Sequence, residues 1–116
     1  MADAIQARKV ADVPDAPNPH NVSARKMHDS EHAVIMHLAL QAGEALHPHI
    51  TPVDVVFYVL EGTGIVEIGD DQLEAGPDTL VESPSGIPHR LVNDSDSVFR
   101  VLVIKTPRPT SQTKLL

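Results

Sequence analysis

The sequence predicts an all-β domain built as a sandwich or a barrel. Apolar and polar residues alternate over several short segments, Gly and Pro recur between them, and no stretch keeps a 3.6-residue periodicity. Alternation with a period of two places successive side chains on opposite faces of a strand. Many short strands separated by such turns are typical of sandwiches and barrels. The 116 residues suffice for one hydrophobic core.

The expected strands follow one another along the middle of the chain, at residues 32–40, 54–60, 64–69, 72–75, 79–83, 91–93 and 97–105. Asp70 and Asp71 lie at the turn of a hairpin between the third and fourth of them. Prolines in residues 1–20 preclude a regular helix, so we expect an extended or disordered N-terminal arm there. The barrel should span residues 21–106, followed by a C-terminal tail over residues 107–116 that we expect to fray.

Composition excludes several classes of function. The net charge of −7 argues against nucleic acid or an anionic membrane surface as a partner. The chain has no cysteine, which removes disulfides, thiolate ligands and cysteine nucleophiles. No apolar run approaches the roughly 20 residues of a membrane span, and the first residues lack the apolar region of a secretory signal. We therefore expect a cytoplasmic protein that binds a small molecule.

Two histidine-bearing segments are the strongest functional signal. His47 and His49 lie two residues apart, so on a strand they would project from the same face. His89 follows a turn containing Pro and Gly, so it can approach from a neighbouring strand. Three neutral imidazoles that leave coordination positions open suit a reactive metal site. We predict that these three histidines hold one metal ion.

The same segments resemble the two motifs of the cupin superfamily. The first motif of that family has Gly, His-x-His, Glu and Gly, and the matching residues here are Gly43, His47, His49 and Gly62. The second motif is matched by Pro84, Gly86, His89 and Asn93. The resemblance implies a double-stranded β-helix, or jelly-roll, barrel. It also implies one divalent transition metal, with iron as the leading candidate and manganese, nickel, copper or zinc as alternatives.

The chain departs from the first motif at the metal-binding Glu, which falls on Val55. Asp54 lies one residue earlier and would face the other way unless a bulge turns it. Glu82 is a second candidate for a fourth ligand or a general base, although a solvated position is expected for both carboxylates. We expect Asn93 to brace the turn near His89 through side-chain hydrogen bonds.

A substrate pocket is expected beside the histidines. If Val55 faces it, Phe57 and Val59 do so as well, and Leu80 or Val81 completes an apolar wall. His37 is expected to be half-buried and hydrogen-bonded, and it would contact a substrate or a metal ligand if its face lines the barrel. The remaining histidines lie in polar, turn-like sequence and are expected to be solvated: His20, His28 and His32.

These residues favour a three-histidine, metal-dependent dioxygenase that acts on a small organic substrate. The alternative is a non-catalytic ligand-binding or sensor cupin with a structural or vestigial metal. A sugar isomerase or epimerase ranks last, because it needs a positioned acid and base and the lysines lie outside the motifs. A homodimer is expected, since small open barrels leave sheet edges to cover.

Overall fold

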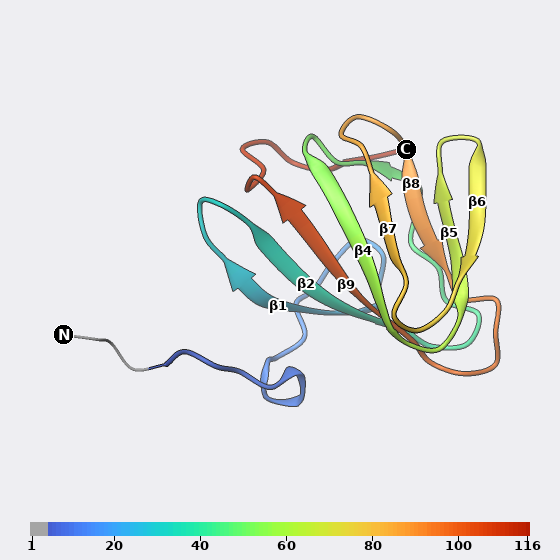
Figure 1. Ribbon diagram of the computed structural model, residues 1–116, viewed down its shortest axis with the longest axis horizontal. Helices are drawn as coiled ribbons and strands as arrows, with labels where there is room; N and C mark the ends of the chain where they lie inside the picture. Colours follow the sequence, from blue (N-terminus) through green and yellow to red (C-terminus); the bar gives the residue numbers. More distant parts are fainter. Residues whose placement is uncertain (1–4) are drawn as a thin grey trace.

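The computed structural model describes residues 5–116, which form two antiparallel sheets packed face to face (Figure 1). The first sheet has the order β1 (Ser23–Asp29), β2 (Val34–Leu40), β9 (Phe99–Thr106), β4 (Asp54–Glu61) and β7 (Leu80–Ser83). The second has the order β10 (Lys114–Leu115), β3 (His49–Ile50), β8 (His89–Val92), β5 (Gly64–Ile68) and β6 (Asp71–Ala75).

The all-β prediction is confirmed. The described residues contain no α-helix, only a short 3₁₀ turn at Val10–Asp12. Within residues 5–116, no helix is long and apolar enough to cross a membrane.

The core lies between the sheets and is centred on β4 and β9. The register places Phe57 opposite Val103 and Val59 opposite Val101, and all four side chains point between the sheets. Each is at most 6% exposed, because the second sheet covers them. Burial of this apolar surface is the main force that holds the sheets together.

Strand β1 was not expected from the sequence, because it is polar and lies at the edge of its sheet. Only Ala24 in it is buried, yet β1 pairs with β2 from Ser23 opposite Ala39 to Asp29 opposite Val34. An edge strand has one partner and a partly solvated face, so it needs little apolar alternation. Backbone pairing rather than side-chain burial therefore defines this strand.

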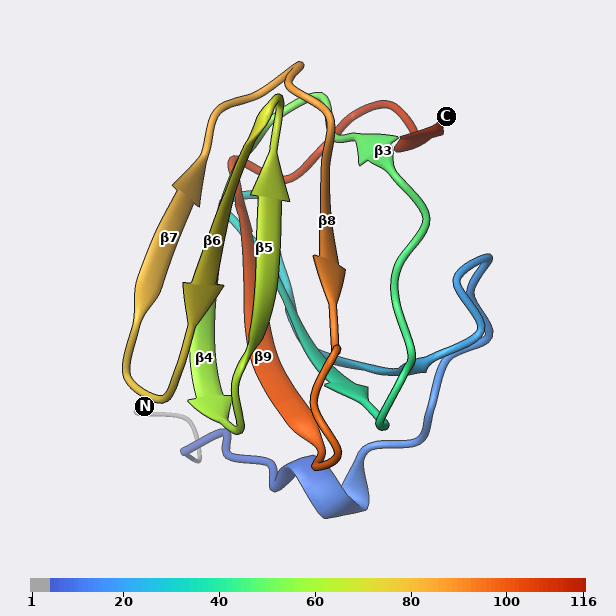
Figure 2. The ribbon, with the colours of Figure 1, turned by 90° about the vertical axis from the view of Figure 1, so that its right-hand side faces the viewer.

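The end of the chain also forms a strand. Leu115 pairs with His49, and the Leu116 N–H donates to the carbonyl oxygen of Pro48 at 3.0 Å. The expectation of a frayed tail is wrong for Lys114–Leu115, because β3 offers these residues a free sheet edge. Figure 2 shows the C-terminus beside β3.

The N-terminal arm returns to the same side of the molecule, where a loop at residues 18–22 is held by Asn18. The Asn18 side-chain amide donates to the carbonyl of Val22 at 2.8 Å, and its oxygen accepts the N–H of His20 at 3.1 Å. Asn21 adopts a positive φ of 57°, which Asn tolerates better than most residues. The loop thereby holds the His20 ring 4.9 Å from the ring of His49 on β3 of the second sheet.

Asn93 braces the turn between β8 and β9, as the sequence predicts. It is 1% exposed, and its amide nitrogen donates to the carbonyls of Leu40 at 2.9 Å and Ser97 at 2.7 Å. Its oxygen accepts the N–H and the hydroxyl of Ser95. One side chain thus ties the end of β2 to this turn.

We predict that Asn93→Ala lowers the free energy of unfolding by about 2–3 kcal/mol, because it leaves buried carbonyl groups without their donor. Urea denaturation measures the change. Asp94→Ala, at the exposed neighbouring position, is the control and should change stability by less than about 0.5 kcal/mol. Equal stabilities for the two variants would contradict the bracing role.

Candidate functional site

A cavity of about 220 Å³ lies between the sheets, on the side where the arm and the tail meet. Its apolar wall comes from β2, β4, β9 and the segment before β3, through Met36, Leu38, Phe57, Val103 and Leu46. The arm loop, Ala24 of β1, His49 of β3, Lys105 of β9, Thr113, and Leu115 of β10 contribute the rest of the wall. The ionisable side chains that line it are His20, His49 and Lys105. Both ends of the chain therefore help to enclose the cavity.

His49 enters the cavity wall because the chain between β2 and β3 is not a regular strand. Leu46 and His49 are both buried, whereas His47 and Pro48 between them are exposed. Leu46 bonds to the second sheet through its N–H, which donates to the Leu91 carbonyl at 2.9 Å. The predicted alternation fails because residues 46–48 lie outside any strand. The spacing of His47 and His49 therefore does not place them on one strand face, but both rings pack against that of His20, with centroids 5.7 Å and 4.9 Å from it.

The backbone of His47 determines the tautomers of two neighbouring histidines. Its carbonyl lies 2.7 Å from Nδ1 of His49, and since a carbonyl only accepts, that nitrogen must carry the proton. Its N–H donates to Nδ1 of His20 at 2.9 Å, so that nitrogen must have a free lone pair. In the neutral rings, Nε2 of His49 is therefore an acceptor, and Nε2 of His20 is a donor. The ring centroids lie 4.9 Å apart.

His89 lies behind His49, with the ring centroids 4.5 Å apart, and packs edge-on against Phe57. Both of its ring nitrogens are paired with buried hydroxyl groups. Nδ1 lies 2.7 Å from Oγ of Ser83, and Nε2 lies 3.2 Å from Oγ1 of Thr51. The ring is 3% exposed, and these two hydroxyls fix its orientation.

The ionisable groups of this region are held toward their neutral forms. Burial, with lesser effects of His49, His47 and Lys105, lowers the pKa of His20 to about 4. Burial also lowers the pKa of His89 to about 4, aided by His49 and Lys105. The pKa of His49 is lowered by burial, although the His47 carbonyl opposes this. His20, His49 and His89 are therefore held toward the neutral form near neutral pH.

The three predicted ligands differ in what their ring nitrogens contact, so their sharing of one metal ion stays a prediction. His47 is exposed, Nε2 of His89 is paired with Thr51, and of the three only His49 presents an unpaired Nε2 to the cavity. No three His, Asp or Glu side chains within residues 5–116 converge closely enough to hold a metal. His20 does not complete a set, because a ring that accepts at Nδ1 carries its proton on Nε2.

The two candidate carboxylates lie outside the cavity. Asp54 is exposed and accepts the N–H of Ser85 at 2.9 Å, and Glu82 is exposed on β7. No bulge turns Asp54 inward. Both occupy the solvated positions that the sequence favoured.

Of the predicted pocket wall, Phe57 lines the cavity, while Val55 and Val59 are buried in the core around it. Val81 packs against the core, and Leu80 is 53% exposed on the outer side. His37 is 1% exposed but lies on the opposite face of β2 from Met36 and Leu38, where its Nε2 accepts from Nε of Arg100 at 3.0 Å. It does not line the cavity.

Sequence reasoning missed His20 and Lys105. His20 was expected to be solvated, but the Asn18 loop and the His47 N–H draw it against His49. Only the tertiary contact reveals this, because polar turn sequence gives no sign of it. Lys105 could have been found, since it shares the inward-facing parity of Phe99, Val101 and Val103 on β9.

The profile of the family described as "Cupin domain" matches residues 34–105, which is more than half of the chain. The chain therefore belongs to the cupin domain family. No curated protein matches it in sequence.

Solved structures with the same fold span nearly the whole chain. The protein TT1209 from Thermus thermophilus is 28% identical with a TM-score of 0.78, over 90% of this chain and 100% of that one. The polyketide cyclase RemF from Streptomyces resistomycificus is 21% identical with a TM-score of 0.83, over 97% of this chain and 86% of that one.

An uncharacterized conserved protein from Klebsiella pneumoniae subsp. pneumoniae, with a double-stranded beta-helix domain, is 13% identical. Its TM-score is 0.81, and the match covers 97% of each chain. These likenesses confirm the double-stranded β-helix fold.

We predict that the protein loses stability as the pH falls from 6.5 to about 4. The pKa of His20 is about 4 in the folded chain against 6.5 for a free ring, so the unfolded chain binds more protons throughout this range. The contribution of His20 to stability is therefore fully present above pH 6.5, and its loss is complete below about pH 4. Urea midpoints measured across this range test it, and His20→Gln should show a shallower decline. A His20→Gln profile parallel to the wild type would contradict the assignment.

Proposed function

We propose that the protein binds a small organic molecule in the cavity between its sheets, with His49 and His20 as its polar contacts. The observation that supports this most is a largely apolar cavity of about 220 Å³ into which two histidines of fixed, opposite hydrogen-bonding character project. Binding sites of small molecules are typically apolar hollows with a few fixed polar groups. The volume lies below the roughly 300–1,000 Å³ of drug-sized sites, so the ligand is small.

The two ring nitrogens set what the ligand must present. Nε2 of His49 accepts a hydrogen bond, so a hydroxyl, enol or acidic N–H of the ligand suits it. Nε2–H of His20 donates, so a carbonyl or ether oxygen suits it. A hydroxyl and a carbonyl on neighbouring carbon atoms would satisfy both. This pairing also gives His49 the position from which to take a proton from a bound ligand.

The metal-dependent dioxygenase predicted from the sequence is the second candidate. The unpaired Nε2 of His49, with the ring of His89 4.5 Å away, favours it. It requires Nε2 of His89 to leave Thr51, and it requires His47, which is exposed with its ring 5.7 Å from that of His20, to converge with the other two histidines on one ion. The two proposals therefore differ in whether binding depends on a metal.

We predict that ligand binding survives removal of metal. Protein treated with EDTA should bind a hydroxyketone probe such as 3-hydroxy-2-butanone as well as untreated protein, measured by NMR shifts of Phe57. Elemental analysis of protein purified without added metal completes the experiment. About one equivalent of a redox metal, lost in His49→Ala together with probe binding, would instead support the dioxygenase.

We further predict that filling the cavity blocks binding. Val103→Phe adds an aromatic ring inside the cavity and should weaken binding of the same probe at least about tenfold, at a cost of about 1–3 kcal/mol in stability. Leu102→Phe is the matched control, because Leu102 adjoins Val103 on β9 and faces the opposite side, as its pairing with His37 shows. Equal binding by both variants would overturn the placement of the ligand in this cavity.

A further inference from the structure

Among the described residues that line the cavity, Lys105 is the one whose side chain, at its ordinary pKa, is positively charged at neutral pH. It lies on the inward face of β9, following Phe99, Val101 and Val103 along that face. Within residues 5–116, none of the ion pairs or side-chain hydrogen bonds involves Lys105, and the residue is half-buried. Burial, with a lesser effect of Lys26, lowers the pKa of Lys105.

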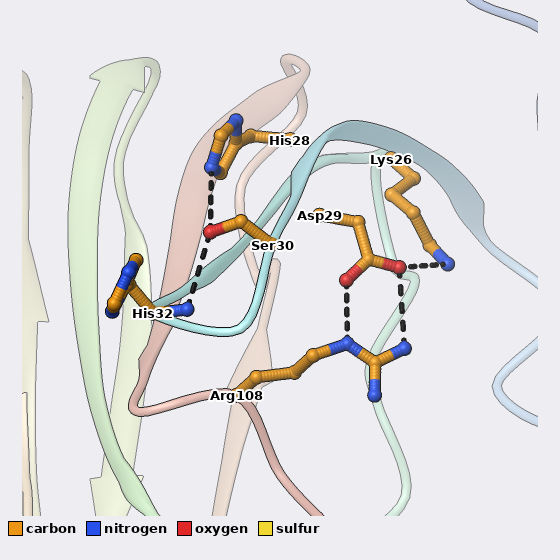
Figure 3. Close-up of polar contacts among 6 residues, drawn as sticks. All are labelled: Lys26, His28, Asp29, Ser30, His32 and Arg108. Atoms are coloured by element: carbon orange, nitrogen blue, oxygen red, sulfur yellow. Dashed lines mark hydrogen bonds and ion pairs between the residues drawn. The ribbon is translucent and has the colours of Figure 1, made fainter.

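No carboxylate is positioned to neutralise Lys105 from within the described chain. None of the residues that line the cavity is Asp or Glu, although the whole sequence contains 16 of them. On the nearby β1, Asp29 already binds the guanidinium of Arg108 at 2.7 Å and the ammonium of Lys26 at 3.1 Å (Figure 3). Asp29 is therefore already paired with two cations at the β1–β2 hairpin. The ring of His28 and the backbone N–H of His32 contact the hydroxyl of Ser30 there, and not Asp29.

Lys105 is thus the one lysine or arginine of the described cavity wall, in a protein whose net charge is −7. Within residues 5–116, every other ionisable group of its wall is a histidine, and a poorly compensated cation in an apolar surrounding is costly. A ligand that brings a negative charge removes that cost, and a charge-assisted hydrogen bond is about twice as strong as a neutral one.

Resting on the proposed function, we infer that the cavity ligand is a small carboxylate, whose anionic group pairs with the ammonium of Lys105 while its apolar part lies against Phe57 and Val103. Nε2–H of His20 is a further donor to such a group, and Nε2 of His49 accepts from a hydroxyl on the ligand. The ligand class is therefore the small organic acids, with hydroxy acids satisfying most of the polar groups.

The experiment compares two pairs of probes of similar shape, butyrate with butyramide and benzoate with benzamide, titrated at pH 7 into the full chain. NMR shifts of Phe57 and Val103 report binding. We expect each carboxylate to bind about tenfold or more tightly than its amide. In Lys105→Met, which keeps the apolar stem and removes the charge, each pair should bind equally and the amides should keep their wild-type affinity.

Lys114→Met is the matched control, because Lys114 is an exposed lysine on β10. It should retain the wild-type preference for carboxylates. Lys105→Met should also raise the thermal midpoint, since it removes a poorly compensated charge, and this confirms that the variant folds.

Two results would overturn the inference and leave the proposed function standing: amides that bind the wild type as tightly as carboxylates, or a carboxylate preference that persists in Lys105→Met. If none of the four probes, nor the hydroxyketone, shifts the cavity resonances of the wild type, both the inference and the proposed function fail.

Discussion

The backbone of a single residue, His47, organises the candidate site. Its carbonyl accepts from Nδ1 of His49, and its N–H donates to Nδ1 of His20. These bonds are possible because residues 46–48 leave the strand, which frees both polar groups of His47 from a ladder. One peptide segment therefore fixes the tautomers of two cavity histidines, and it also fastens the N-terminal arm to the second sheet.

The cavity depends on the hydrogen bond between the His47 N–H and His20, which holds the arm loop, and on the pairing of β10 with β3. The arm loop and the tail both contribute to the wall, so the two sheets alone do not enclose the space. The enclosure of the cavity also explains why the pKa values of its ionisable side chains are lowered. Burial lowers the pKa values of His20, His89 and Lys105, and within the described chain no carboxylate of the wall offsets it. The described wall of the cavity therefore contains histidines and one lysine but no carboxylate, which supports the proposal of an acidic or hydroxylated ligand.

Most of the fold could be predicted from the sequence, because β4 and β9 alternate strictly and the turns contain Gly and Pro. Strand β1 could not, since its pairing rests on backbone bonds rather than burial. The site was harder to predict. Alternation of side chains would place His47 and His49 on one face, but alternation holds only inside a strand. His20 joins the site through contacts distant in sequence, whereas the parity of Lys105 on β9 was readable in advance.

The protonation of the ring nitrogens of His49 and His20 tests the account most directly. Long-range ¹H–¹⁵N NMR correlation of the full chain at neutral pH distinguishes a protonated ring nitrogen from a bare one. The account predicts a proton on Nδ1 and a lone pair on Nε2 for His49, with the reverse for His20. A proton on Nε2 of His49, or one on Nδ1 of His20, would contradict it, because the His47 backbone could then not set the two rings.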